Sequence, residues 1–320
     1  RGEGMVIRKI AAVYFSAVGG TKEVTERIAA KLAEQYAAET GGTGNENAGR
    51  DAKDAGGIGD RDAGEYAEEI GETGALEVRT VDFTLPCART ETFVFDRETL
   101  VVFGTPTYAG RVPNKVLPMI RELFIGNGAQ TVAVVTFGNR NFDSSLTELT
   151  QELSGLGFVP VAGAAVACRH VFSKKIAPGR PDAEDLAKVD RFAEQVKTKL
   201  DDASETGMDT AEIASIAGRE EVGPYYTPLG RDGLPAKFLK AKVQTNLIKC
   251  DDCGICARVC PLGSIDVMET SRVPGICIKC HACVVNCPQG AKYFGDPAFL
   301  SHVAYLEEHY QRRAEPEFFL

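Results

Sequence analysis

Eight of the ten cysteines fall within residues 250–287, and their spacing constrains the fold of this segment more than any other feature of the chain. The pattern C-x2-C-x2-C-x3-C-P occurs twice, and the second copy begins 27 residues after the first. A segment this short has too small an apolar core to be stable alone, so we expect the cysteines to stabilise it by binding metal. The first copy contains Cys250, Cys253, Cys256 and Cys260, and the second contains Cys277, Cys280, Cys283 and Cys287.

The spacing within each copy is typical of a chain that binds two [4Fe–4S] clusters. Three closely spaced cysteines wrap around three corners of one cubane, and the fourth, which a proline follows, points to the other cluster. Structural zinc is the alternative, but its usual signature is two separated C-x2-C pairs. We therefore predict that one cluster binds Cys250, Cys253, Cys256 and Cys287, and that the other binds Cys277, Cys280, Cys283 and Cys260.

Residues 247–295 resemble the two-cluster bacterial ferredoxins, and both cysteine runs match the pattern of that family without departure. His281 lies inside the second run, and we interpret it as a surface residue that is hydrogen-bonded to water rather than as a ligand. The two cysteines outside this segment, Cys87 and Cys168, are interpreted as small buried side chains.

Residues 5–200 alternate strand-like apolar runs with helical patterns. Strands that are covered on both faces, as in a parallel sheet, show such nearly continuous apolar runs. In the first helical segment, Val24, Ile28 and Leu32 recur at i+4 spacing and would face the sheet. We predict a doubly wound α/β domain with a five-stranded parallel sheet. The predicted strands are residues 10–15, 76–82, 99–104, 131–137 and 158–167, and the predicted helices are 21–38, 113–125, 142–155 and 182–200.

The other segments lack this periodicity. Residues 39–75 contain ten glycines, ten acidic residues and three basic residues, a composition that cannot bury enough apolar surface to offset the entropy of ordering. We predict a disordered acidic insertion there, with a partner-docking loop as the alternative. Residues 201–246 gather glycine and proline and are predicted to be a linker, and 296–320 are predicted to form a short helix and a tail.

Three loops follow predicted strands directly, at the edge where open α/β sheets bind ligands. The first loop leads into a helix and offers hydroxyls and backbone N–H groups at the helix N-terminus, a combination that suits a phosphate. This loop contains no Lys or Arg. The other two offer backbone amides to the polar edge of a flat ring and one aromatic each for stacking, Tyr108 and Phe142. The first loop is Ser16, Ala17, Val18, Gly19, Gly20 and Thr21; the second is Thr105, Pro106, Thr107, Tyr108, Ala109 and Gly110; the third is Gly138, Asn139, Arg140, Asn141 and Phe142.

With these loops, residues 5–200 resemble the flavodoxin family, which implies that the loops bind FMN. Val18 and Gly20 replace a hydroxyl residue and an Asn that are common in the phosphate loop of that family. The loss of one side-chain donor costs about 1 kcal/mol. The whole arrangement resembles the EFR family of flavodoxin–ferredoxin fusions, which are iron–sulfur flavoproteins. Neither a Walker pattern nor G-x-G-x-x-G occurs, so the sequence predicts no ATP or NAD(P) site.

The net charge of −9 derives mostly from the 39–75 segment, which contributes a net −7. The remainder is nearly neutral and has no basic face for nucleic acid. No apolar run approaches the roughly 20 residues that span a bilayer, and no basic-then-apolar export signal is present. We therefore expect a cytoplasmic protein without a membrane span, and the exposed iron–sulfur chemistry favours an anaerobic setting.

The favoured function is electron transfer between the clusters and FMN within one chain. The chain would in this way relay electrons between redox protein partners. The clusters carry single electrons at low potential, whereas FMN accepts one or two. The first alternative is a flavoenzyme that reduces a small acceptor, such as a quinone, at an open face of the ring. The second alternative is an assembly protein with an empty flavin site. No residue stands out as a general acid, base or nucleophile, and the four histidines form no cluster along the sequence.

Overall fold

The structure is a computed structural model that describes residues 6–39, 76–206 and 221–320. The predicted insertion at 39–75 lies outside the described residues apart from its first position, and so does the middle of the predicted linker. Within the described ranges, no helix is long and apolar enough to cross a membrane.

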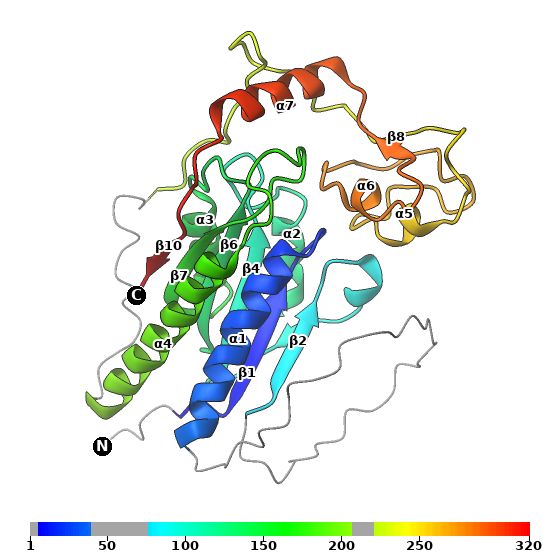
Figure 1. Ribbon diagram of the computed structural model, residues 1–320. Coiled ribbons are helices and arrows are strands. Elements are labelled where there is room, and N and C mark those ends of the chain that lie inside the picture. Colours follow the sequence, from blue (N-terminus) through cyan, green and yellow to red (C-terminus); the bar gives the residue numbers. More distant parts are fainter. Residues whose placement is uncertain (1–5, 40–75, 207–220) are drawn as a thin grey trace.

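The larger domain is built on a six-stranded sheet with the strand order β2-β1-β4-β6-β7-β10 (Figure 1). The first five strands are parallel and follow the order 2-1-3-4-5 of flavodoxin-like folds, so the predicted α/β fold class is confirmed. All five coincide closely with the predicted apolar runs. Their bounds are β1 (Lys9–Tyr14), β2 (Val78–Asp82), β4 (Thr99–Pro106), β6 (Gln130–Phe137) and β7 (Val159–Ala167).

Helices cover both faces of this sheet. The helices α1 (Gly20–Glu39) and α4 (Ala183–Thr206) pack on one face, where their apolar side chains join alternate residues of the strands in one core. The helices α2 (Leu117–Leu123) and α3 (Ser145–Gly155) cover the other face, which contains most of the buried phenylalanines. Short elements complete this side: the 3-10 turn η1 (Pro86–Ala88) and the paired strands β3 (Phe93–Val94) and β5 (Phe124–Ile125).

Two helices begin later than the sequence pattern predicts. The α2 helix begins at Leu117 because the preceding residues form a turn in which Val116 N–H donates to the Pro113 carbonyl. The α3 helix begins at Ser145 because Asp143 has a φ of +42°, a left-handed conformation that cannot continue a helix.

The sixth strand comes from the end of the chain and was not predicted. After the cysteine-rich domain, α7 (Pro297–His309) runs back over the larger domain, and β10 (Glu317–Phe319) pairs antiparallel with β7 (Figure 1). The ring of Phe318 stacks on Phe192 of α4, with the centroids 4.9 Å apart. The tail predicted at 296–320 therefore attaches the two domains to each other.

The cysteine-rich domain has a structural repeat of 27 residues. It contains the helical turns α5 (Ile255–Arg258) and α6 (Ala282–Val285) and the antiparallel pair β8 (Gln244–Thr245) and β9 (Lys292–Tyr293). Positive φ angles recur at the same interval and fix the loops that carry the cysteines in one conformation. These pairs are Asp252 and Lys279, Gly254 and His281, and Gly263 and Gly290.

Candidate functional site

The three predicted flavin loops meet at one edge of the sheet. They follow β1, β4 and β6, which are adjacent and parallel, so their carboxyl ends lie side by side. The cysteine-rich domain lies over this same edge (Figure 1). The structure thus brings the two predicted cofactor regions together, although about 100 residues separate the third loop from the first cysteine run.

The first loop closes around the first turn of α1. The Ser16 hydroxyl accepts a hydrogen bond of 3.0 Å from Lys22 N–H. Gly19 has a φ of +93°, and within the described ranges no atom outside Gly19 and its two chain neighbours lies within 4 Å of the position that a Cβ would take. The positive end of the helix dipole and this open backbone suit an anion. The Thr21 hydroxyl is buried and bonds Thr136 at 2.8 Å, so it points away from that opening.

The rest of this loop packs inward. Ala17 contacts the apolar core, and Gly20 passes close to Cys168, whose pKa burial raises to about 12. Arg169 brings a positive charge to this loop, because its guanidinium lies 3.5 Å from the Val18 carbonyl. This residue was not among those predicted from the sequence. Arg169 stands two residues after the end of β7, and its position after a parallel strand is the signal that places it at this edge.

Tyr108 begins a tight turn in the second loop. Tyr108 and Arg111 exchange backbone hydrogen bonds of 2.9 and 3.2 Å, and both Ala109 and Gly110 have positive φ. A Cβ at Gly110 would stand 2.2 Å from a carboxylate oxygen of Asp143, so only glycine fits there. Burial, and then the charges of Cys280 and Cys277, raise the pKa of Tyr108 well above its usual value. The phenol of this loop is therefore within electrostatic range of two of the predicted cluster ligands.

The strand that leads into this turn is tightly packed. The Thr107 hydroxyl bonds Ser145 at 2.7 Å, and its N–H donates to the Thr136 carbonyl. Thr105 is fully buried, and its hydroxyl has no hydrogen-bond partner among the residues that the structure describes. Pro106 ends β4 between these two threonines.

The third loop is engaged by the C-terminal tail. Asn139 is buried; its Nδ2 donates to the carbonyls of Tyr310 and Arg312, and its Oδ1 accepts from Ala314 N–H. The Arg140 guanidinium lies 3.8 Å from the centroid of the Tyr226 ring in the linker. The Asn139 side chain therefore binds the protein's own backbone rather than presenting its amide to a ligand.

Phe142 does not line the open surface of the loops. It is 1% exposed and packs against Phe137 in the core, at a centroid distance of 5.5 Å. Its neighbour Asn141 is exposed and accepts from Asp143 N–H, while Gly138 lies under the ring of His170. The prediction that Phe142 stacks on a flavin therefore has no support in its position.

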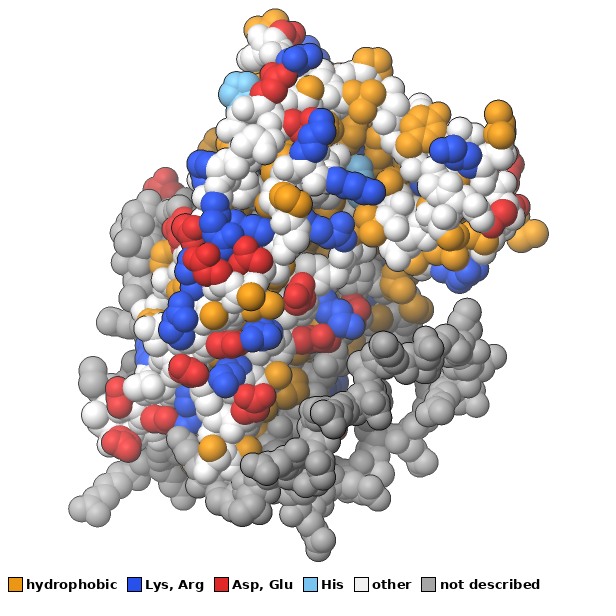
Figure 2. All heavy atoms as spheres, viewed as in Figure 1, with side chains coloured by type: hydrophobic (Ala, Val, Ile, Leu, Met, Phe, Trp, Pro, Cys, Tyr) orange, Lys and Arg blue, Asp and Glu red, His pale blue; other side chains and the backbone are white. Residues whose placement is uncertain are grey.

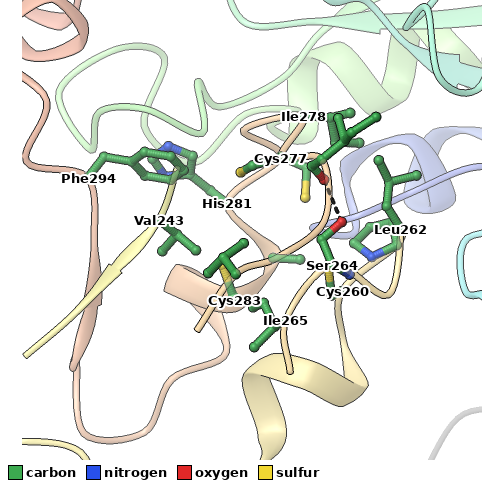
Figure 3. A pocket seen from close by; sticks show the side chains of 15 residues that line it. Val243, Cys260, Leu262, Ser264, Ile265, Cys277, Ile278, His281, Cys283 and Phe294 are labelled. Carbon is green, nitrogen blue, oxygen red and sulfur yellow. Dashed lines mark hydrogen bonds between the residues drawn. The ribbon is translucent and has the colours of Figure 1, made fainter. Parts of the chain in front are cut away.

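Four cysteines from both runs line one cavity in the cysteine-rich domain (Figure 3). Its lining also includes Ser264 and Ile278, and Ile278 packs against the apolar core of the larger domain. Ser264 N–H donates to Cys260 Sγ at 3.3 Å, and this hydrogen bond favours the charged form of the sulfur. The four cysteines are Cys260, Cys277, Cys280 and Cys283, which is the set predicted for one cluster.

The four cysteines of the other predicted set do not line this cavity. Cys253 is exposed, and the charge of Cys250 acts on Cys256. Burial raises the pKa of Cys287, but hydrogen bonds from the backbone N–H groups of the residues that follow it lower the pKa by more. The net effect is a lowered pKa. Gln289 donates to Asp251 at 3.0 Å and so joins the end of the second run to the start of the first. Among the described residues, no three Cys, His, Asp or Glu side chains are arranged to hold a single metal ion.

A layer of histidine and phenylalanine rings fills the junction of the two domains. Phe172, which follows β7, lies 5.0 Å from His281 and 4.8 Å from Phe299 of α7, measured between ring centroids. Burial lowers the pKa of His170 to about 3 and that of His281 to about 4. His281 is 7% exposed, so the expectation of a surface residue was wrong: its ring stacks on Phe294.

The linker is also fixed to the flavin loops. Tyr226 N–H donates to the Ala109 carbonyl at 2.8 Å, and Arg111 donates to the Gly223 carbonyl while pairing with buried Glu148.

Elsewhere on the molecule, Cys168 is buried as predicted, but Cys87 is exposed, contrary to prediction. Charged side chains of both signs alternate over the larger domain, whereas apolar side chains gather on the cysteine-rich domain (Figure 2).

No family model matches the chain, and no curated protein matches it. Among solved structures, a flavodoxin from the domain Archaea has 12% sequence identity and a TM-score of 0.36, covering 60% of this chain and 99% of the flavodoxin. A Streptococcus pneumonia TIGR4 flavodoxin has 13% identity and a TM-score of 0.33, covering 59% and 98%. The rubredoxin oxygen:oxidoreductase of the anaerobe Desulfovibrio gigas has 16% identity and a TM-score of 0.32, covering 62% and 38%. The fold assignment rests on the strand order and not on these scores.

The flavodoxin-like domain is joined to the cysteine-rich domain at the sheet edge where the three loops lie. The phosphate end of FMN fits the open backbone at Gly19 with Arg169 nearby. At the ring end, Tyr108 is the remaining aromatic, because Asn139 and Phe142 are engaged by the protein itself. The soft thiolates and the shared cavity of the second cysteine set suit an iron–sulfur cluster.

Proposed function

We propose that this protein transfers electrons between two [4Fe–4S] clusters and FMN within one chain. The observation that carries the proposal is the packing of Ile278, which lies between Cys277 and Cys280, against the core of the flavodoxin-like domain. This packing brings the second cysteine run to the flavin loops, where the charges of Cys280 and Cys277 act on the phenol of Tyr108. The proximity gives an electron a short route between the cofactors.

Different residues would hold the phosphate end and the ring end of FMN. Ser16, Gly19 and the N-terminus of α1, with Arg169, would hold the FMN phosphate. Tyr108 would cover one face of the ring, and the junction between the domains would exclude water around it. FMN supplies the ability to accept one or two electrons, and the clusters supply single electrons at low potential.

The order of the centres follows from their placement. The set of Cys260, Cys277, Cys280 and Cys283, here the inner set, is joined to the flavodoxin-like domain by the packing of Ile278. The other set, here the outer set, contains exposed Cys253 and can be approached from solvent. Electrons would therefore pass between a redox protein partner and FMN through the outer cluster and then the inner one.

The test is the kinetics of electron transfer after rapid one-electron reduction of the anaerobic protein. We expect bleaching of the clusters to be followed by reduction of the flavin at a first-order rate that does not change with protein concentration, because both centres belong to one chain. A rate that rises in proportion to protein concentration would show transfer between molecules and would contradict the proposal.

A second candidate function is a flavoenzyme that reduces a small acceptor, such as a quinone, at FMN. It is favoured by the burial of Phe142, which leaves one face of the ring without the predicted stacking partner. Catalytic consumption of a soluble quinone by the reduced protein would favour this function over transfer to a protein partner.

A further inference from the structure

Lys292 is a buried cation inside the cysteine-rich domain. It belongs to β9, is 3% exposed, and donates from its Nζ to the Thr245 hydroxyl at 2.7 Å and to the Thr270 carbonyl at 2.5 Å. Both partners are neutral oxygens, and within the described part of the chain no carboxylate comes within 4.0 Å of the ammonium. A buried charge normally has a partner of opposite sign, so this one needs an explanation.

The 27-residue repeat shows that the fold does not require a charge at this place. The repeat equivalent of Lys292 is Ile265, which is also 3% exposed and belongs to the apolar core of the domain. The two residues stand five positions after the fourth cysteine of their respective runs. The position after the first cysteine run thus holds the aliphatic side chain of Ile265, whereas the equivalent position after the second run holds the ammonium group of Lys292.

Hydrogen bonds place Lys292 near cysteines of the predicted clusters. Ala291 N–H, one residue before it, donates to Cys287 Sγ at 3.2 Å, and Thr270, whose carbonyl binds the ammonium, donates from its hydroxyl to Asp252 between Cys250 and Cys253. The ammonium charge also acts on the thiols of Cys256 and Cys283. Cys256 and Cys287 belong to the outer set, whereas Cys283 lines the cavity of the inner set. The missing counter-charge is therefore explained if negatively charged clusters occupy both sets.

We propose that Lys292 is the shared counter-ion of the two clusters and raises the reduction potential of both. This inference rests on the proposed function, because it requires the clusters to be present. Reduction adds one negative charge to a cluster, and a fixed cation nearby stabilises that charge more strongly in a dry interior than in water. Lys292 would in this way raise the reduction potentials of both clusters together.

The test is an anaerobic redox titration of the Lys292→Met protein, with iron and sulfide counted in the same sample. We expect the ratio of reduced to oxidised cluster at a fixed potential to fall about tenfold for both clusters, a shift of about 59 mV for a one-electron couple. The matched control is Lys249→Met, which removes an exposed lysine next to Cys250 and should leave both potentials nearly unchanged.

Unchanged potentials in a Lys292→Met protein with its full iron content would overturn the inference. If that variant loses its clusters, Lys292→Arg decides: retention of the clusters with the arginine supports a need for charge, and loss in both variants shows a packing role only and overturns the inference. Absence of clusters from the unaltered protein would instead remove the proposed function itself.

Discussion

Cys260→Ala is expected to remove the cluster beside the flavin loops, although Cys260 belongs to the first cysteine run. The cavity that it lines also contains Cys277, Cys280 and Cys283 of the second run. Iron should fall from about eight to about four atoms per chain. The remaining cluster would be the outer one, so rapid reduction of FMN by the clusters should be lost.

Cys287→Ala is the matched variant, because Cys287 stands at the repeat-equivalent position of the second run. It should also lose about four iron atoms, but from the outer cluster, and the rapid step between the inner cluster and FMN should persist. Iron analysis and anaerobic kinetics together check the pair. If each run closed its own cluster, the two kinetic results would be exchanged, and that exchange would refute the crossed arrangement.

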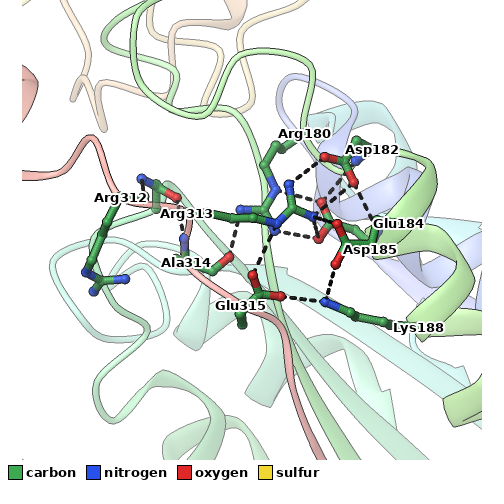
Figure 4. Close-up of polar contacts among 10 residues, drawn as sticks. Arg180, Asp182, Glu184, Asp185, Lys188, Arg312, Arg313, Ala314 and Glu315 are labelled. Atoms are coloured by element: carbon green, nitrogen blue, oxygen red, sulfur yellow. Dashed lines mark hydrogen bonds and ion pairs between the residues drawn. The ribbon is translucent and has the colours of Figure 1, made fainter.

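Arg180→Met is expected to lower the free energy of unfolding by about 3 kcal/mol, because it leaves a buried carboxylate without its main partner. Arg180 is 7% exposed and pairs with both oxygens of Asp185, which is fully buried, at 2.6 and 2.5 Å (Figure 4). Its third hydrogen bond, of 2.7 Å, is to the Ala314 carbonyl in the tail. Arg313 of the tail also reaches Asp185, at 2.9 Å. Denaturant unfolding followed by circular dichroism measures the change.

The control for this prediction is Arg121→Met, which breaks an exposed pair with Glu152 of similar geometry. We expect an effect below about 1 kcal/mol there, because water screens the charges. Arg180→Met should also expose the tail to proteolysis, since Ala314 and β10 lose one attachment to the larger domain. Equal stability of the two variants would show that the Arg180 network does not fasten the tail.

The sequence was sufficient to predict the sheet of the larger domain, because a parallel strand that is buried on both faces must be apolar along its whole length. The strand β10 gave no such signal. It is three residues long, and its place beside β7 depends on α7 carrying the chain back across the molecule and on the stacking of Phe318 on Phe192. These are tertiary contacts that periodicity does not encode.

The spacing within each cysteine run is local and can be read from the sequence, and four of the eight cysteines, Cys260, Cys277, Cys280 and Cys283, line one cavity. That both sets bind clusters stays a prediction. The junction between the domains was not predictable in the same way. His281 is interpreted from its run as a surface residue, but Phe172, Phe294 and Phe299 come from three separate segments to bury it. Phe142 likewise follows a strand end as a stacking residue would, but a left-handed Asp143 turns the chain there and leaves its ring in the core.

The composition of protein purified without oxygen tests most directly whether one chain holds two iron–sulfur clusters and one flavin at the junction of its domains. We expect about eight iron atoms, about eight acid-labile sulfides and one FMN per chain. Zinc in place of iron, or iron without labile sulfide, would contradict this expectation.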